Sequence, residues 1–185
     1  MRLFLAIPLA DQVRDKLSAI QARLKATGAD VKWVEAENFH LTVAFLGDLS
    51  EALLPDIETV CESIVESTAA FRVGVRGASY FPRKGPQIKT LWAGVTEGTA
   101  EWKMLARRTE EAFAPFGVAR GPELVPHLTL GRVRSDREMG LLREAVAGEA
   151  ETECGVQNAG ELALVQSFLN PRGATHKTVK TWKLV

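Results

Sequence analysis

The predicted strands and helices follow the same order in the two halves of this 185-residue chain. Apolar periodicity predicts strand, helix, strand, helix, strand in each half. Such a repeat of order predicts two similar lobes within one domain of residues 1–185, built mainly from residues 1–80 and 89–168, with elements that can cross between lobes. The predicted strands are 3–7, 31–34, 39–46, 71–81, 91–95, 126–133, 155–168 and 178–184, and the predicted helices are 13–24, 53–64, 100–114 and 135–148.

The start of the last helix carries a capping signal. Ser135 is followed three residues later by Glu138, the spacing at which two side chains satisfy free amides in the first turn. This pattern predicts a helix that opens at Ser135 and ends at Gly148. The segment 155–168 then reads as one long strand.

The charges balance over the whole chain, with 23 basic and 23 acidic residues. This balance excludes a polycation that grips nucleic acid through bulk charge, so any such contact would be local. Residues 48–66 carry acids and no base, whereas residues 71–90 carry bases and no acid. The segregation indicates either a basic cleft or ordinary solvated faces.

Cysteine content and hydropathy indicate the cellular setting. The two cysteines, Cys61 and Cys154, are too few for a disulfide framework, which favours a reducing cytoplasm. No apolar run approaches the roughly 20 residues of a membrane span. The opening apolar segment is short and contains Pro8, so we interpret it as a strand rather than a signal peptide. We expect a cytoplasmic monomer without a membrane partner.

Two of the three histidines begin nearly identical phrases. Residues 39–43 read Phe-His-Leu-Thr-Val, and residues 126–130 read Pro-His-Leu-Thr-Leu. Side chains alternate along a strand, so His40 shares a face with Thr42, and His127 shares a face with Thr129. If the lobes pair about a two-fold axis, both faces border one small volume that a phosphate group would fill.

Paired imidazoles suit phosphodiester chemistry. Because histidine titrates near neutral pH, one ring can accept a proton from the attacking group while the other protonates the leaving oxygen. The hydroxyls of Thr42 and Thr129 would donate to the non-bridging phosphate oxygens. Arg132 lies five residues after His127, on the opposite face of a regular strand. Only a bend or bulge after Gly131 would bring it to the phosphate.

Each triplet also has other readings. A single histidine on a strand is more often a hydrogen-bonded structural residue than a catalyst, and only the duplication favours a functional site. A zinc site would need three or four ligands, and neither triplet offers a cysteine or carboxylate at a suitable spacing. We therefore expect no metal and no other cofactor.

The paired triplets, one in each half, resemble the two-histidine phosphoesterase superfamily. The sequence is most similar there to the RNA 2′,3′-cyclic phosphodiesterases, also called 2′-5′ RNA ligases. The similarity extends over most of the chain and is carried by five segments: residues 2–7 (Arg-Leu-Phe-Leu-Ala-Ile), 33–34 (Trp-Val), 38–42 (Asn-Phe-His-Leu-Thr), 45–47 (Phe-Leu-Gly) and 126–132 (Pro-His-Leu-Thr-Leu-Gly-Arg).

This resemblance implies a bilobal α+β fold, in which two lobes of antiparallel sheet plus helices face each other across a central cleft. It also implies hydrolysis of a 2′,3′-cyclic phosphate at an RNA end, tRNA-like or other, to a 2′-phosphomonoester without metal. By motif position, His40 would donate a proton to the departing 3′ oxygen and His127 would activate water. The reverse reaction with a 5′-hydroxyl end would join RNA strands through a 2′-5′ linkage.

Several residues outside the triplets have open interpretations. His176 stands where the family commonly has tyrosine, and we expect it on the surface. Phe4 and Phe39 could stack on a base or lie in the core. The cations Arg83, Lys84 and Lys89 could follow an RNA backbone or solvate a loop.

Two rival functions remain compatible with the sequence. A related phosphoesterase acting on 2′-5′ oligonucleotides or on another cyclic nucleotide would carry identical triplets. A non-catalytic protein that binds RNA ends would keep the fold without turnover.

Overall fold

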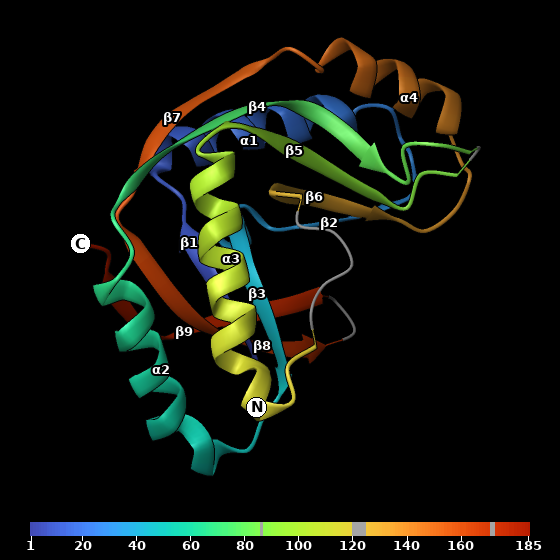
Figure 1. Cartoon of the computed structure of the whole chain (residues 1–185). Helices are drawn as coiled ribbons and strands as arrows, with labels where there is room; N and C mark the ends of the chain where they lie inside the picture. Colours follow the sequence, from blue (N-terminus) through green and yellow to red (C-terminus); the bar gives the residue numbers. More distant parts are fainter. Residues whose placement is uncertain (86, 120–124, 171–172) are drawn as a thin grey trace.

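The structure is a computed structural model, and it describes residues 1–85, 87–119, 125–170 and 173–185, without the side chains of 169, 170 and 173. The described residues form nine strands, four α-helices and three short 3-10 helices (Figure 1). The strands are β1 (Arg2–Pro8), β2 (Val31–Trp33), β3 (His40–Asp48), β4 (Phe71–Phe81), β5 (Thr90–Glu97), β6 (His127–Val133), β7 (Glu153–Ala159), β8 (Glu161–Asn170) and β9 (Gly173–Lys183). The helices are α1 (Asp11–Lys25), η1 (Ala36–Asn38), η2 (Glu51–Leu53), α2 (Leu54–Glu66), α3 (Thr99–Phe113), η3 (Ala114–Phe116) and α4 (Met139–Gly148).

The strands form two antiparallel sheets, which confirms the expected α+β class. Sheet A has the order β3-β1-β8-β9, and sheet B has the order β2-β6-β5-β4-β7. Both sheets draw strands from both halves of the chain, because β2 and β4 join sheet B whereas β8 and β9 return to sheet A. The halves of the sequence therefore exchange strands, and neither sheet is built from one half alone.

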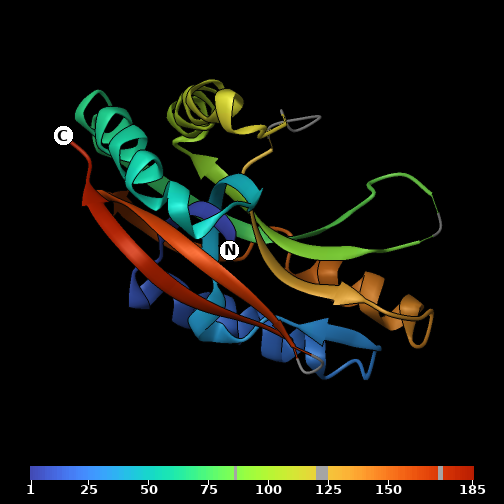
Figure 2. The same ribbon diagram turned by 90° about the horizontal axis from the view of Figure 1, so that it is seen from below.

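The helices cover the sheets in a crossed pattern. α1 follows β1 of sheet A but packs against β7 of sheet B, and α3 follows β5 of sheet B but packs against β3 of sheet A. α2 lies beside β9, and α4 lies against β4 (Figures 1 and 2). The crossing ties the two sheets together through one continuous apolar core.

The first helix shows how apolar spacing produces this packing. Its apolar residues recur every three or four positions, so they form one stripe along the helix. That stripe is buried, whereas Asp15, Lys16 and Arg23 between its members are exposed. The helix gives way to a turn in which Gly28 has a φ of +73°. The buried stripe consists of Val13, Leu17, Ile20 and Leu24.

Two sequence expectations about the C-terminal third are wrong. The last helix begins at Met139 rather than Ser135, because Glu138 has a φ of 55° and lies in the left-handed region, outside the helix. No described side chain caps this helix. The expected single strand 155–168 is two strands, β7 and β8, which separate at Gly160 and enter different sheets. The chain therefore leaves sheet B before Gly160 and enters sheet A after it.

The final strand is longer than expected. β9 begins at Gly173 rather than Thr178 and pairs with β8 along its whole length. In the described part of the chain, no helix is long and apolar enough to cross a membrane.

Candidate active site

His40 and His127 are the first residues of β3 and β6, two strands that meet where the sheets approach each other. Both strands have the same burial pattern over their first five residues. The leucine of each triplet is fully buried, whereas the histidine and threonine on its two sides are partly exposed. The alternation confirms that each triplet presents an imidazole and a hydroxyl on one face.

Each imidazole is oriented by the same backbone contact. The Nδ1 atom of His40 lies 2.7 Å from the carbonyl oxygen of Asn38, and the Nδ1 atom of His127 lies 2.8 Å from that of Val125. A carbonyl oxygen only accepts, so Nδ1 carries the hydrogen in both rings. Nε2 is consequently left as the atom that can accept or donate a proton in the site.

Further hydrogen bonds hold β3 in position. The side chain of Asn38 donates to the carbonyl oxygen of Ala174 on β9, at 3.3 Å. The indole Nε1 of Trp102 donates to the carbonyl oxygen of Thr42, at 3.1 Å. The His40 triplet is therefore attached to the end of sheet A and to α3 as well as to its own strand.

A β-bulge follows the threonine in both strands. In β6, Thr129 pairs with Trp92 and Gly131 pairs with Leu91, so Leu130 is the extra residue opposite β5. In β3, the pairing to β1 steps in the same way from Thr42 to Ala44. An extra residue shifts the alternation by one position, so the residue five places after each histidine turns to the histidine's side.

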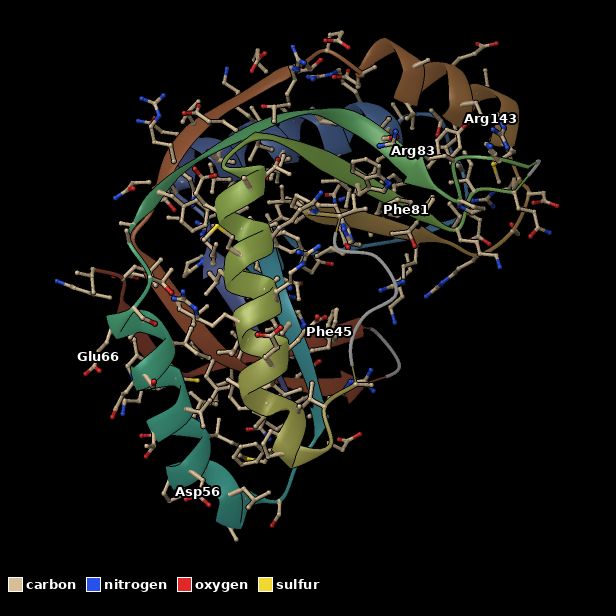
Figure 3. The ribbon with its side chains drawn as sticks, in the orientation of Figure 1. Phe45, Asp56, Glu66, Phe81, Arg83 and Arg143 are labelled. Atoms are coloured by element: carbon tan, nitrogen blue, oxygen red, sulfur yellow. The ribbon has the colours of Figure 1, made fainter. Side chains whose placement is uncertain are left out.

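Two side chains enter the site because of these bulges. Arg132 and Phe45 occupy equivalent places, and both line a pocket of about 440 Å³ together with His40, Thr42 and Thr129. The bulge required for Arg132 therefore exists, although it lies just before Gly131 rather than after it. The side chain of Phe45 is 67% exposed and extends from β3 (Figure 3).

Phe45 lines the pocket but was not expected there from the sequence alone. Its spacing could have suggested a site position, because Phe45 lies five residues after His40, just as Arg132 lies five residues after His127. The spacing had meaning only with a bulge in both strands, and an isolated sequence does not reveal a bulge of this kind.

The ring of His40 lies in a cluster of aromatic side chains. Phe4 stacks on it with a centroid distance of 4.7 Å, and His176 meets it edge-on at 5.2 Å. His176 is half-buried and lines the pocket, so it does not lie on the open surface as expected. Its ring reaches His40 although β9 and β3 are opposite edges of sheet A. Phe39 is 3% exposed and belongs to the main apolar core, whereas Phe4, also 3% exposed, lines the pocket beside His40.

The surroundings of His40 change its acidity. Its pKa is lowered from 6.5 to about 4, mainly by burial. The hydrogen bond to the Asn38 carbonyl acts in the opposite direction, and the nearby His176 and His127 contribute to the lowering. Burial also lowers the pKa of His176. Without a bound anion, His40 is therefore neutral at pH 7.

The ring of His127 lies against a second aromatic group. Phe81 meets it edge-on at 5.3 Å, and Trp92 lies at 6.1 Å. Phe81 and Trp92 are stacked on each other at 4.8 Å. The two histidines thus differ in their supports, since His40 has a titratable neighbour and His127 is bordered by apolar rings.

The polar groups of the pocket determine which ligands it can bind. The pocket contains imidazole nitrogens, threonine hydroxyls and guanidinium groups. Among the residues that the structure describes, no group of three or more histidine, cysteine or carboxylate side chains could hold a metal ion. His40, Thr42, Thr129 and Arg132 can therefore bind an anion in this pocket. His127 is not among the lining residues, but its charge acts on His40.

Comparison with known proteins gives consistent matches over the whole chain. Residues 7–92 match the family described as LigT like Phosphoesterase. A protein named RNA 2′,3′-cyclic phosphodiesterase from Methanothermobacter thermautotrophicus is 35% identical over 184 residues, which cover 100% of this chain and 99% of the relative. A protein of the same name from Thermotoga maritima is 35% identical over 72% of this chain and 71% of its own length.

Solved structures show the same fold. The structure of TT0787 of Thermus thermophilus superimposes with a TM-score of 0.83 at 25% identity and covers 100% of this chain and 98% of its own. The structure of E. coli LigT complexed with 3′-AMP has a TM-score of 0.78 at 23% identity, with 99% and 97% coverage. The chain therefore belongs to the LigT-like phosphoesterase family.

Proposed function

We propose that this protein hydrolyses 2′,3′-cyclic phosphate ends of RNA to 2′-phosphomonoesters. The observation that carries the proposal is the pair of equivalent His/Thr faces on β3 and β6, each with Nδ1 bound to a backbone carbonyl and Nε2 left for proton transfer. The similarity to full-length relatives named RNA 2′,3′-cyclic phosphodiesterase supports it. The expected monomeric state and cytoplasmic location stay predictions.

The proposed reaction needs two proton transfers. Nε2 of His127 takes a proton from water while the water oxygen forms a bond to phosphorus. The bond from phosphorus to the 3′ oxygen breaks, and Nε2 of His40 gives its proton to that oxygen. Thr42 and Thr129 donate hydrogen bonds to the non-bridging oxygens, where negative charge increases. The assignment of donor and acceptor comes from the family resemblance, because the two Nδ1 anchors are alike.

The proposed role of His40 requires its imidazolium form. A bound phosphate is expected to raise the pKa of His40 above the value of about 4 that burial imposes, because a nearby anion stabilises the charged ring. Titration of the histidine ring protons by NMR, with saturating inorganic phosphate and with sodium chloride of equal ionic strength, measures the change. A pKa that stays the same in both salts would contradict an acid role for His40.

Phe45 and Arg132 are proposed to hold the terminal nucleoside. An exposed phenyl ring accepts any base by stacking, which is worth about 1–3 kcal/mol, and a guanidinium plane can stack on a base or bind phosphate. Both side chains line the pocket that contains His40 and the two threonines. We expect Phe45 to act mainly in substrate binding and Arg132 in both binding and charge stabilisation.

Replacing Phe45 with alanine is expected to raise KM about tenfold and to change kcat little, because stacking contributes to binding before and during the reaction. Steady-state kinetics on an RNA that ends in a cyclic phosphate measure both constants. Phe168→Ala is the matched control, since Phe168 is also an exposed phenylalanine on a strand but does not line the pocket. Equal behaviour of the two variants would remove Phe45 from the site.

An assay of the purified protein tests the proposed function. The substrates are an RNA ending in a 2′,3′-cyclic phosphate, a 2′-5′-linked oligonucleotide and other cyclic phosphate esters, each with an excess of chelator. We expect turnover of the first substrate to a 2′-phosphomonoester, with a bell-shaped pH profile. Turnover only of another ester would favour the related-phosphodiesterase reading, and binding of RNA ends without any turnover would favour the non-catalytic reading.

A further inference from the structure

A row of cations extends outward from Arg132 along sheet B. Lys32 on β2 is the direct partner of Arg132 in the antiparallel register, so the two side chains share a face of the sheet. Arg134 follows just after the end of β6 and is exposed. Like charges directly opposite each other on a sheet are destabilising. The row therefore costs stability unless an anion binds to it.

Among the described residues, these cations have no acidic partners. Lys32, Arg132 and Arg134 take part in none of the salt bridges between described residues. Lys180, by contrast, pairs with Glu58 and Glu62. Because no described acid neutralises the cations of the row, they can bind an external anion.

The segment that connects β4 to β5 adds a cation that is already held in place. The guanidinium carbon of Arg83 lies 5.3 Å from the centre of the Trp92 ring, and Trp92 stacks on Phe81. Arg83 is exposed and forms no ion pair with a described residue. A guanidinium group packed on an aromatic ring keeps its N–H groups available and loses less freedom when it binds an anion.

One run of the chain, residues 48–66, carries six acidic residues and no base, and most of it forms η2 and α2. Asp56 and Glu66 belong to α2, which lies far from Arg83 in Figure 3. Acids also occur near the row, since the backbone amide of Arg134 donates to the carbonyl oxygen of Asp30, so the separation of charge is local. Arg132 lines the pocket, and the row of cations therefore adjoins the site.

We propose that Lys32, Arg134 and Arg83 bind phosphodiester groups of the RNA strand next to its reacting end. The inference rests on the proposed function, because the row begins at Arg132 in the pocket for the terminal nucleotide. A mononucleotide ends inside that pocket and does not reach the row, whereas a longer strand carries further phosphates out of it. The surface therefore selects polynucleotide ends over cyclic mononucleotides.

The test compares a short single-stranded RNA ending in a 2′,3′-cyclic phosphate with a 2′,3′-cyclic mononucleotide. For each, kcat/KM is measured between about 50 and 200 mM salt. The variants are Lys32→Gln with Arg134→Gln, and Arg83→Gln alone. The control is Lys16→Gln with Lys103→Gln, which removes two exposed lysines from α1 and α3 that do not line the pocket.

The wild-type protein is expected to prefer the RNA and to lose that preference as salt rises. Each lost phosphate contact should reduce the slope of log kcat/KM against log salt by about 0.7, so the Lys32/Arg134 variant should lose about 1.4 and Arg83→Gln about 0.7. Mononucleotide turnover should stay within about twofold. Equal slopes in the variants and the control, or a wild-type protein without RNA preference, would overturn the proposal. Failure to turn over either substrate would instead contradict the proposed function.

Discussion

His40→Ala and His127→Ala are each expected to lower kcat by about 10²- to 10⁴-fold, with a smaller change in KM. The reason is that each imidazole transfers a proton in the transition state, a role that typically contributes such a factor. Both rings are partly exposed and lie at the start of their strands, so the fold should tolerate their loss. Single-turnover rates on RNA with a cyclic phosphate end measure the effect without interference from product release.

The matched variant for this experiment is His176→Phe. It keeps a ring of similar size against Phe4 and His40 while it removes the third imidazole of the site. We expect a rate loss of about tenfold or less, because His176 is not assigned a proton transfer. If His176→Phe lost as much activity as His40→Ala while circular dichroism showed both variants folded, the two-histidine assignment would be wrong.

Gly77→Ala is expected to lower the free energy of unfolding by about 3 kcal/mol or more. Gly77 has a φ of +71°, and a Cβ atom added there would lie 2.0 Å from the carbonyl oxygen of Ala150, far inside contact distance. Its amide also donates to the carbonyl oxygen of Thr152, at 2.8 Å. The clash is with backbone atoms, so the segment after α4 would have to move away from β4.

Gly28→Ala separates the two causes of this loss. Gly28 has a nearly identical φ of +73°, but an added Cβ atom meets nothing within 4 Å. The unfavourable backbone angle alone should cost about 1–2 kcal/mol. Urea unfolding followed by circular dichroism measures both variants. Losses of the same size in Gly77→Ala and Gly28→Ala would show that the contact with Ala150 relaxes at no cost.

Most of the local structure was predictable because it depends on neighbours in the sequence. The apolar stripe of α1 and the strand 71–81 follow from side-chain periodicity, and the structure places them as expected. The capping pattern at Ser135 misled, because a cap requires a backbone conformation that Glu138 does not have. The apparent strand 155–168 misled because strand propensity does not reveal which sheet each part joins.

The part of the site that depends on side-chain alternation along a single strand was predictable from the sequence. The sequence by itself determined that His40 shares a face with Thr42 and that His127 shares a face with Thr129, because a strand turns each second side chain to the same side. The paired triplets, together with the other matching segments of the sequence, also indicated the family. The sequence also showed that Arg132 could reach the site only if a bend or bulge followed Gly131. The structure has a bulge in this strand, at Leu130.

Only the tertiary structure decided how these faces meet. The exchange of β4 and β8 between the sheets, the bulges that turn Phe45 and Arg132 into the pocket, and the return of His176 to His40 depend on pairing between segments far apart in the sequence. Such pairing is selected by the burial of whole sheets against each other and by the register of neighbouring strands. The pKa of His40 depends on it too, because burial by distant segments sets how much water reaches the ring.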